Sequence, residues 1–256
     1  MRSGEVVNGG DRMAYEFLEL SEPKNSVARL TLRRESKKNA LCMAMRDELE
    51  DAFARMVADS DVNAVVLAGG DGIFCAGFDL KEGMESGGKS FLHRFSEFFE
   101  ACYLFPKPMV AAVDGLALAG GFDLALIADF IIASSRSVFG HPEIDFGPVA
   151  IVPLARFVSP ARLRELCLLG TNIDAETAKA YGIVHEIVEP GRTEAVATEL
   201  AEKLAAKPPA GMASTKSAIG RFLRTGETII SDGAAIENVL AGRAEAYDSY
   251  VSDKLK

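Results

Sequence analysis

The chain has 256 residues, of which 48% are hydrophobic and 25% are charged, and its formal net charge is −9. These proportions are those of an ordinary globular protein with a sizeable core, and the negative charge disfavours nucleic acid and anionic lipid as partners. Every apolar run is much shorter than about 18 residues and the polar N-terminus lacks an apolar signal region, so we expect no membrane span and a cytoplasmic location.

The predicted elements of the N-terminal part begin after a loose tail at residues 1–12. Two strands are expected at 15–20 and 27–32, joined by a turn at 21–25. A helix is expected next, because four apolar residues recur at helical spacing and form a core stripe. These are Met45, Leu49, Phe53 and Met56.

Further apolar, strand-like runs follow, with helical patterns between several of them. They lie at residues 64–67, 109–113, 130–133 and 183–188. The alternation of strands and helices is typical of an α/β architecture.

The C-terminal part is expected to be helical. Ser159-Pro160 predicts the start of a helix and Gly170 its end. Beyond Pro190-Gly191 the pattern is entirely helical, with a break at residues 207–209, so two more helices are expected at about 211–224 and 227–250. We therefore divide the chain into a tail at 1–12, a main α/β domain at 13–195 and a helical region at 196–256.

Two glycine-containing turns mark a candidate site. Cys75-Ala76-Gly77-Phe78-Asp79 and Ala119-Gly120-Gly121-Phe122-Asp123 each follow an apolar run, and the second turn leads into a helix. The first N–H groups of a helix lack intrahelical partners and suit an oxygen that gains negative charge. An isolated Gly-Gly pair most often serves tight packing, but two such turns favour an oxyanion hole, with one backbone donor from Phe78 and one from Gly120.

Two acidic side chains accompany these donors. Asp123 stands in the second turn, and Glu143 follows about twenty residues later in His141-Pro142-Glu143. His141 neighbours Glu143, although a structural or exposed imidazole is the commoner case.

Cysteine and histidine are scattered along the chain. The four cysteines show no close pairing, and neither residue type has metal-ligand spacing, so we expect no disulfide framework and no zinc site. The absence of a Gly-x-Ser-x-Gly turn disfavours a serine hydrolase.

In these motifs the chain resembles the enoyl-CoA hydratase/isomerase family, also called the crotonase family. Several strings carry the resemblance in the family's order and spacing. They are Asn39-Ala40-Leu41, residues 64–69, residues 74–80, residues 107–115, residues 120–125 and residues 139–143, and the likeness continues through 178–184 and 208–216.

The resemblance implies a crotonase-like spiral of β-β-α units in the main domain and chemistry on an acyl-CoA through a thioester enolate. Coenzyme A would be part of the substrate, with no separate cofactor. The C-terminal helices of this family pack between subunits, which implies a homotrimer or a dimer of trimers.

The resemblance also implies roles for single residues. The oxyanion donors match Phe78 and Gly120, and the family's two catalytic glutamates match Asp123 and Glu143. The residues that match the family's CoA and substrate contacts are Ala40, Ala76, Phe78, Asp79, Leu80 and Gly120.

Asp123 departs from the hydratase pattern, because aspartate is one methylene shorter than glutamate. Syn hydration needs both carboxylates, whereas a 1,3-proton shift needs one base, which Glu143 supplies. We therefore expect an enoyl-CoA hydratase first and an enoyl-CoA isomerase second. Some dienoyl-CoA isomerases share this aspartate but add another where this chain has Ile151. A catalytically weak acyl-CoA-binding protein, a thioesterase and a decarboxylase are further alternatives.

The sequence leaves two features undetermined, namely the size of the acyl pocket and the residues that bind the CoA phosphates. The family often has alanine in place of Phe78, so a bulkier residue here changes the pocket. The nearest basic residues to Asn39-Ala40-Leu41 are Arg33, Arg34, Lys37 and Lys38, which form either a phosphate patch or an ordinary charged loop.

Overall fold

The computed structural model describes residues 15–70, 72–85, 94–95, 97–99, 102–145, 149 and 152–224. The tail expected at 1–12 and the second C-terminal helix expected at 227–250 lie outside this range. No helix in the described ranges combines the length and the apolar character needed to cross a bilayer.

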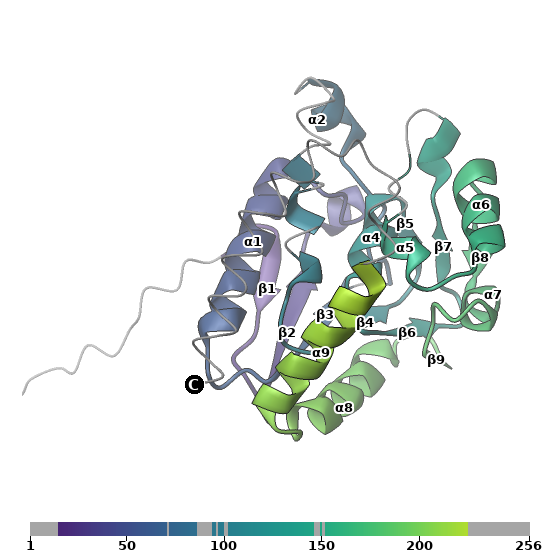
Figure 1. Ribbon diagram of the computed structural model, residues 1–256. Coiled ribbons are helices and arrows are strands. Elements are labelled where there is room, and N and C mark those ends of the chain that lie inside the picture. Colours follow the sequence, from purple (N-terminus) through teal and green to yellow (C-terminus); the bar gives the residue numbers. More distant parts are fainter. Residues whose placement is uncertain are drawn as a thin grey trace, which may run out of the picture.

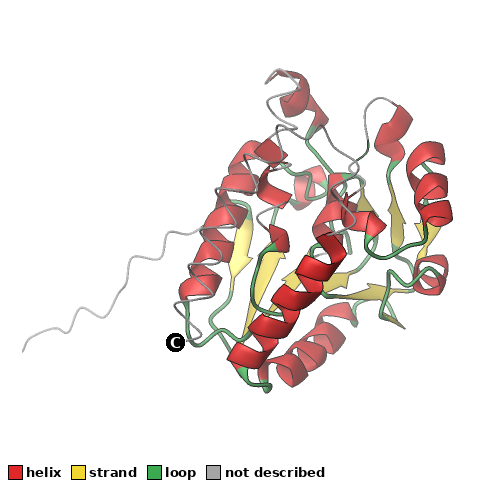
Figure 2. Cartoon of the chain, viewed as in Figure 1, coloured by secondary structure: helices red, strands yellow, loops and turns green. Residues whose placement is uncertain are grey.

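A six-stranded sheet forms the centre of the molecule (Figures 1 and 2). Its strand order is β1-β2-β3-β4-β6-β9; β1 is antiparallel to β2 and the others are parallel to their neighbours. The strands are β1 Leu18–Leu20, β2 Val27–Leu32, β3 Ala64–Ala68, β4 Met109–Val113, β6 Phe130–Ser134 and β9 Glu186–Val188.

Both faces of this sheet are buried, which explains why its strands are continuous apolar runs. In β3, Val65 and Leu67 face the larger core cluster, whereas Val66 faces a smaller one on the opposite side. Helix α1, Met43–Ala58, contributes its apolar stripe to the larger cluster. Helix α8, Thr193–Ala205, covers the other face with alanines at every fourth position, where small side chains permit close packing.

A second, three-stranded sheet has the order β5-β7-β8. It consists of β5 Leu116–Leu118, β7 Val138–Gly140 and β8 Ile173–Asp174. The chain repeatedly passes from a long strand to a short one and then to a helix: β4 and β5 lead to α4, Gly120–Leu126, and β6 and β7 lead to the short 3-10 helix η2, Pro142–Asp145. This is the expected arrangement of β-β-α units.

The remaining helices surround the two sheets (Figure 1). They are η1 Glu35–Lys37, α2 Leu80–Glu85, α5 Val152–Ala155, α6 Pro160–Leu169, α7 Ala175–Ala180 and α9 Pro209–Arg224. Helix α6 has the predicted ends, because the Ser159 side chain accepts a hydrogen bond from Arg162 N and Gly170 adopts a left-handed conformation with φ 62°.

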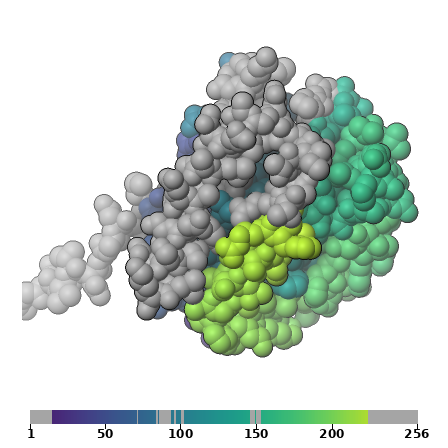
Figure 3. Space-filling view, viewed as in Figure 1, coloured from purple at the N-terminus to yellow at the C-terminus, as the bar shows by residue number. Residues whose placement is uncertain are grey.

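Helix α9 lies on the surface beside α8 (Figure 3). The ammonium of Lys216 anchors it, donating to Asp129 Oδ2 at 2.6 Å and to the Lys107 carbonyl at 2.9 Å. Three large apolar side chains of α9 remain exposed, namely Ile219, Phe222 and Leu223.

Two predicted strands are shorter than expected because their ends bond elsewhere. The amides of Glu16 and Phe17 donate to the carboxylate of Glu48 at 2.8 and 2.9 Å, so β1 begins only at Leu18. The amide of Ile183 donates to the Ala178 carbonyl at 2.9 Å, so β9 begins at Glu186.

Candidate active site

Backbone pairing brings the two glycine-containing turns together. Cys75 forms a parallel bridge with Ala117 of β5, and Leu118 N donates to the Cys75 carbonyl at 3.0 Å. The first turn therefore runs alongside the segment that leads into α4.

Glycine is required where the turns touch. Gly77 has φ 103°, and a Cβ there would lie 2.8 Å from Ala119 Cβ and 3.5 Å from Gly120 N. A Cβ on Gly120 would lie 2.6 Å from Cε1 of Phe78. Residues 78 and 120 are thus neighbours, as the proposed pair of oxyanion donors demands.

Ala119 is held in an unfavourable backbone conformation immediately before α4. Its φ is 51°, which costs a non-glycine residue about 1–3 kcal/mol. Its own N–H donates to the Gly140 carbonyl at 2.8 Å, and its carbonyl accepts from Phe122 N and Asp123 N. These bonds fix the first turn of α4, where the N–H of Gly120 has no acceptor one turn earlier within the helix.

The segment containing Ala40 supports the first turn. Leu41 N donates to the Gly77 carbonyl at 2.7 Å, and Asp79 N donates to the Leu41 carbonyl at 2.8 Å. Ala76 N donates to the Lys38 carbonyl at 3.0 Å. Ala40, Ala76 and Asp79 therefore lie beside one another, whereas Leu80 begins α2 and is 57% exposed.

Arg34 and Asn39 tie this segment together. The Arg34 guanidinium donates to Asp79 Oδ2 and to the Ala40 carbonyl, both at 2.7 Å. The Asn39 amide nitrogen lies within hydrogen-bond distance of the carbonyl oxygens of Gly69, Ile73 and Phe74. Neither contact is predictable from the sequence, because the partners of these two side chains do not follow from their positions along the chain.

The two carboxylates lie on opposite sides of His141. His141 is fully buried, Asp123 is 1% exposed and the Glu143 side chain is 14% exposed. His141 Nδ1 is 3.0 Å from Glu143 Oε1, and Nε2 is 3.8 Å from Asp123 Oδ1. The spacing His-x-Glu was the only signal of this contact in the sequence, where a structural imidazole was the commoner interpretation.

Four buried polar atoms of this group have no hydrogen-bond partner. They are both carboxylate oxygens of Asp123, Glu143 Oε2 and His141 Nε2. Leaving a buried polar group unsatisfied costs about 1–3 kcal/mol. Because four such atoms belong to one small group of side chains, they are suited to bind a polar ligand.

The surroundings shift the ionisation of these groups. Burial raises the pKa of Asp123 to about 7; the charge of His141 lowers it and that of Glu143 raises it. Burial alone would lower the pKa of His141, but the hydrogen bond with Glu143 and the charges of Asp123 and Glu143 raise it above its ordinary value. Burial, with both carboxylates, raises the pKa of the nearby Cys167 thiol to about 11, so this thiol is neutral at pH 7. Strongly shifted groups of this kind cluster at functional sites.

An aromatic cluster adjoins the turn of Phe78. The centroid of the Phe78 ring is 4.6 Å from that of Phe95 and 6.3 Å from that of Phe99. Because the Phe78 ring also faces Gly120, this cluster borders the candidate site with apolar surface.

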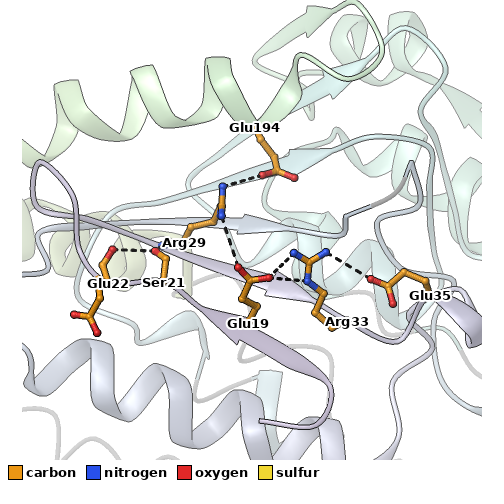
Figure 4. Close-up of polar contacts among 7 residues, drawn as sticks. All are labelled: Glu19, Ser21, Glu22, Arg29, Arg33, Glu35 and Glu194. Carbon is orange, nitrogen blue, oxygen red and sulfur yellow. Dashed lines mark hydrogen bonds and ion pairs between the residues drawn. The ribbon is translucent and has the colours of Figure 1, made fainter. Parts of the chain in front are cut away.

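Two of the four basic residues considered for binding the CoA phosphates form ion pairs with acidic side chains of the protein. Arg33 pairs with Glu19 and Glu35, and Glu19 also pairs with Arg29 (Figure 4). Arg34 pairs with Asp79. Lys37 and Lys38 are exposed, so they are the members of this group best placed to meet a phosphate.

The described residues of this region form neither a metal site nor part of the open depression described below. Among the described residues, no three or more side chains of the ligand types are grouped so that they could hold a metal ion. All four cysteines are buried and unpaired. An open depression of about 400 Å³ near Lys179 and His185 contains none of the predicted site residues.

Comparison with known proteins identifies the family and supports the fold. A family model described as "Enoyl-CoA hydratase/isomerase" matches residues 22–235. The chain belongs to the enoyl-CoA hydratase/isomerase family. A protein of Rhizobium meliloti (strain 1021) named "Probable enoyl-CoA hydratase" is 38% identical over 238 residues, covering 89% of each chain. "Short-chain-enoyl-CoA hydratase" of Clostridium acetobutylicum is 32% identical over 237 residues, covering 88% of this chain and 86% of the relative.

A solved structure shares the fold. An enoyl-CoA hydratase/isomerase from Xanthobacter autotrophicus Py2 superposes with a TM-score of 0.81 at 33% identity, covering 89% of this chain and 87% of that one. The predicted family membership and the crotonase fold are therefore confirmed.

Proposed function

We propose that the protein is an enoyl-CoA hydratase, which adds water across the double bond of a 2-enoyl-CoA. The relatives named above as hydratases support this function, and so does a site that joins two backbone donors to two carboxylates. The observation that carries the proposal is the group of four unpaired buried polar atoms beside the adjoining turns of Phe78 and Gly120.

The backbone amides of Phe78 and Gly120 would bind the thioester oxygen. As water adds to C3, the electrons of the double bond move toward the thioester and its oxygen gains negative charge. Each donor of such a hole contributes about 3–4 kcal/mol when it is aimed at the developing charge. The contact between the two turns, at Gly77 and Ala119, would keep the donors at a fixed separation.

The carboxylates would handle the water and its proton. Asp123 would orient the water, and Glu143 would accept a proton as the water oxygen bonds to C3. Glu143 would then deliver a proton to C2, which restores its carboxylate and completes the addition of one water molecule. General acid–base catalysis of this kind contributes about 10²–10⁴-fold.

Isomerisation is the second candidate function, and the short side chain of Asp123 is the observation that favours it. A 1,3-shift of the double bond needs Glu143 alone, which takes a proton from one carbon and returns one to another. Asp123→Asn should then lower hydration much more than isomerisation. Equal losses in both reactions would assign Asp123 the same role in each.

The test is mass spectrometry of the acyl-CoA after incubation with 2-enoyl-CoA or 3-enoyl-CoA in heavy water. Hydration adds one water molecule, isomerisation introduces deuterium without added water, and a thioesterase would release free CoA. A decarboxylase would release carbon dioxide only from an acyl-CoA that carries a free carboxylate, which is therefore tested as a separate substrate. We expect addition of water to 2-enoyl-CoA. If no enoyl-CoA is changed while binding remains measurable, the protein is an acyl-CoA-binding member instead.

Glu143→Gln is the corresponding variant, and Asp145→Asn in the same short helix is its control. Glu143 is largely buried beside His141, whereas Asp145 is exposed. We expect Glu143→Gln to lose at least about 10³-fold in kcat and to keep acyl-CoA binding. Full turnover by this variant would remove Glu143 from the mechanism.

The assembly would be a homotrimer or a dimer of trimers. The exposed apolar residues of α9, Ile219, Phe222 and Leu223, support a contact surface between subunits. Light scattering after size-exclusion chromatography measures the mass directly, and a mass near the 27.4 kDa of one chain would contradict this assembly.

A further inference from the structure

Among the residues that the structure describes, His141 is the imidazole that contacts both acidic side chains of the site. It comes from the loop between β7 and η2, whereas Asp123 projects from α4 and Glu143 from η2. The His141 ring also packs against the Phe122 ring, with centroids 5.1 Å apart, which holds it in place. The ring therefore cannot turn away to solvent without leaving a fully buried position.

Without a positive charge on His141, the carboxylates of Asp123 and Glu143 would have no opposite charge between them. Asp123 and Glu143 are the titratable groups that act on His141, and Cys167 of α6, a neutral thiol at pH 7, faces the same carboxylates. Burial and the charge of Glu143 both disfavour ionisation of Asp123, so an opposite charge between the two side chains stabilises its ionised form.

We propose that His141 is a positioning residue: Nδ1–H holds Glu143 Oε1 so that Oε2 is presented to substrate, and the imidazolium lies between the two carboxylates. The arrangement leaves Glu143 Oε2, His141 Nε2 and both Asp123 oxygens for the water and the acyl group. The inference rests on the proposed hydratase function, because it deepens the role of the same carboxylates.

The geometry also predicts how two substitutions differ. Asparagine at position 141 keeps a neutral donor close to the place of Nδ1, whereas leucine removes both the donor and the charge. A loss of Glu143 alignment of about 1 Å can cost about 10²-fold in rate. We therefore expect kcat to fall about 10²-fold in His141→Leu and distinctly less in His141→Asn, with KM changed little in either.

The pH profile separates positioning from a merely structural effect. Without the imidazolium, the pKa of Asp123 rises, since the charge of His141 lowers it in the native protein. The acidic limb of the pH–rate profile should therefore move to higher pH in both variants. Misfolding would lower the rate at every pH without moving the limb. His185→Asn, which changes an exposed imidazole outside the site, should alter neither the rate nor the position of the acidic limb.

A second measurement does not depend on turnover. The chain has three histidines, so selective ¹⁵N labelling of histidine gives few imidazole signals, and the His141→Asn spectrum assigns that of His141. We expect His141 to titrate above the ordinary value of about 6.5, and its midpoint to fall in Asp123→Asn and in Glu143→Gln.

These measurements distinguish failure of the proposed hydratase function from failure of the positioning role of His141. If the native protein hydrates no enoyl-CoA but the titration behaves as described, the proposed function fails and the contact of His141 with both carboxylates stands. If His141 is neutral at pH 6, or its midpoint is the same in the native protein and both carboxylate variants, the inference is wrong. Native turnover in His141→Leu with an unshifted pH profile would also overturn it.

Discussion

Gly121 lies against the backbone of Cys75: a Cβ at position 121 would be 2.3 Å from the Cys75 carbonyl oxygen and 2.7 Å from the carbonyl carbon. Both obstacles are backbone atoms of the first turn, so neither can move aside as a flexible side chain would. The close approach of the two turns, on which the candidate site depends, therefore requires glycine at this position.

We predict that Gly121→Ala separates the turns and lowers stability. Overpacking of a close contact costs about 1–3 kcal/mol or more, and the displaced turn should also lower kcat. The control is Gly220→Ala in α9, where a Cβ would meet no atom within 4 Å. Denaturant unfolding should show a gain of up to about 1 kcal/mol for that variant. Equal stability of Gly121→Ala and the native protein would contradict the contact.

The second prediction concerns stability against pH. The folded-state pKa of Asp123 is about 7, against an ordinary value of 3.8. Between these values the folded protein binds more protons than the unfolded chain, so the free energy of unfolding falls as the pH rises. The total effect of this residue is on the order of a few kcal/mol.

Asp123→Asn removes this titration. Chemical unfolding at pH 4 to 6 should show a flatter dependence on pH in this variant than in the native protein. The pKa of His141 is also raised in the folded protein, but its contribution to stability is lost only as the pH rises above the ordinary histidine value of about 6.5. His141 therefore does not account for a difference between pH 4 and 6. Asp145→Asn, at an exposed position, is the control. Parallel curves for native protein and Asp123→Asn would show that Asp123 is ionised in the fold.

The third prediction concerns the ion pair between Arg34 and Asp79, whose side chains are 15% and 17% exposed. Because Asp79 directly follows Phe78, loss of the pair should loosen the first turn. We expect Arg34→Gln and Asp79→Asn each to lower kcat/KM, and the double variant to be little worse than either. The coupling energy should be about 0.5–3 kcal/mol.

Arg33→Gln is the matched control, because Arg33 pairs with Glu19 and Glu35 in a more exposed network. Exposed pairs contribute about 0–1 kcal/mol, so this variant should leave kcat/KM nearly unchanged. Additive losses in the Arg34 and Asp79 variants would show that the pair does not act as a unit.

The fourth prediction concerns the acyl group. Phe78→Ala keeps the backbone N–H but removes a ring that faces Gly120 and packs against Phe95. We expect turnover of a short enoyl-CoA to persist and kcat/KM for bulkier acyl chains to rise relative to it. Phe157→Ala removes the same volume elsewhere at the edge of the core and should not change this ratio. An unchanged ratio in Phe78→Ala would place the acyl chain away from this ring.

Much of the main sheet could be predicted from sequence, because strands buried on both faces are continuous apolar runs. The strands at Val27–Leu32 and Met109–Val113 have the predicted bounds. The three strands of the second sheet were not predicted, since each has only two or three residues and its partners are distant in the sequence.

The site was only partly predictable for a similar reason. The two turns and both acidic residues lie in short sequence motifs, and these motifs have the order and spacing of a known family. The contact of His141 with Asp123 depends on how α4 packs against the segment after β7, which no local pattern encodes. The pairing of Arg33 with Glu19 likewise follows from the antiparallel register of β1 and β2.

The central claim is that the amides of Phe78 and Gly120 hold one thioester oxygen beside Asp123 and Glu143. The most direct measurement is a crystal structure of the Glu143→Gln variant with a bound 2-enoyl-CoA. We predict that the thioester oxygen lies about 2.7–3.1 Å from both amide nitrogens, with C3 of the acyl group facing Asp123. An oxygen beyond hydrogen-bond reach of either amide would contradict the account.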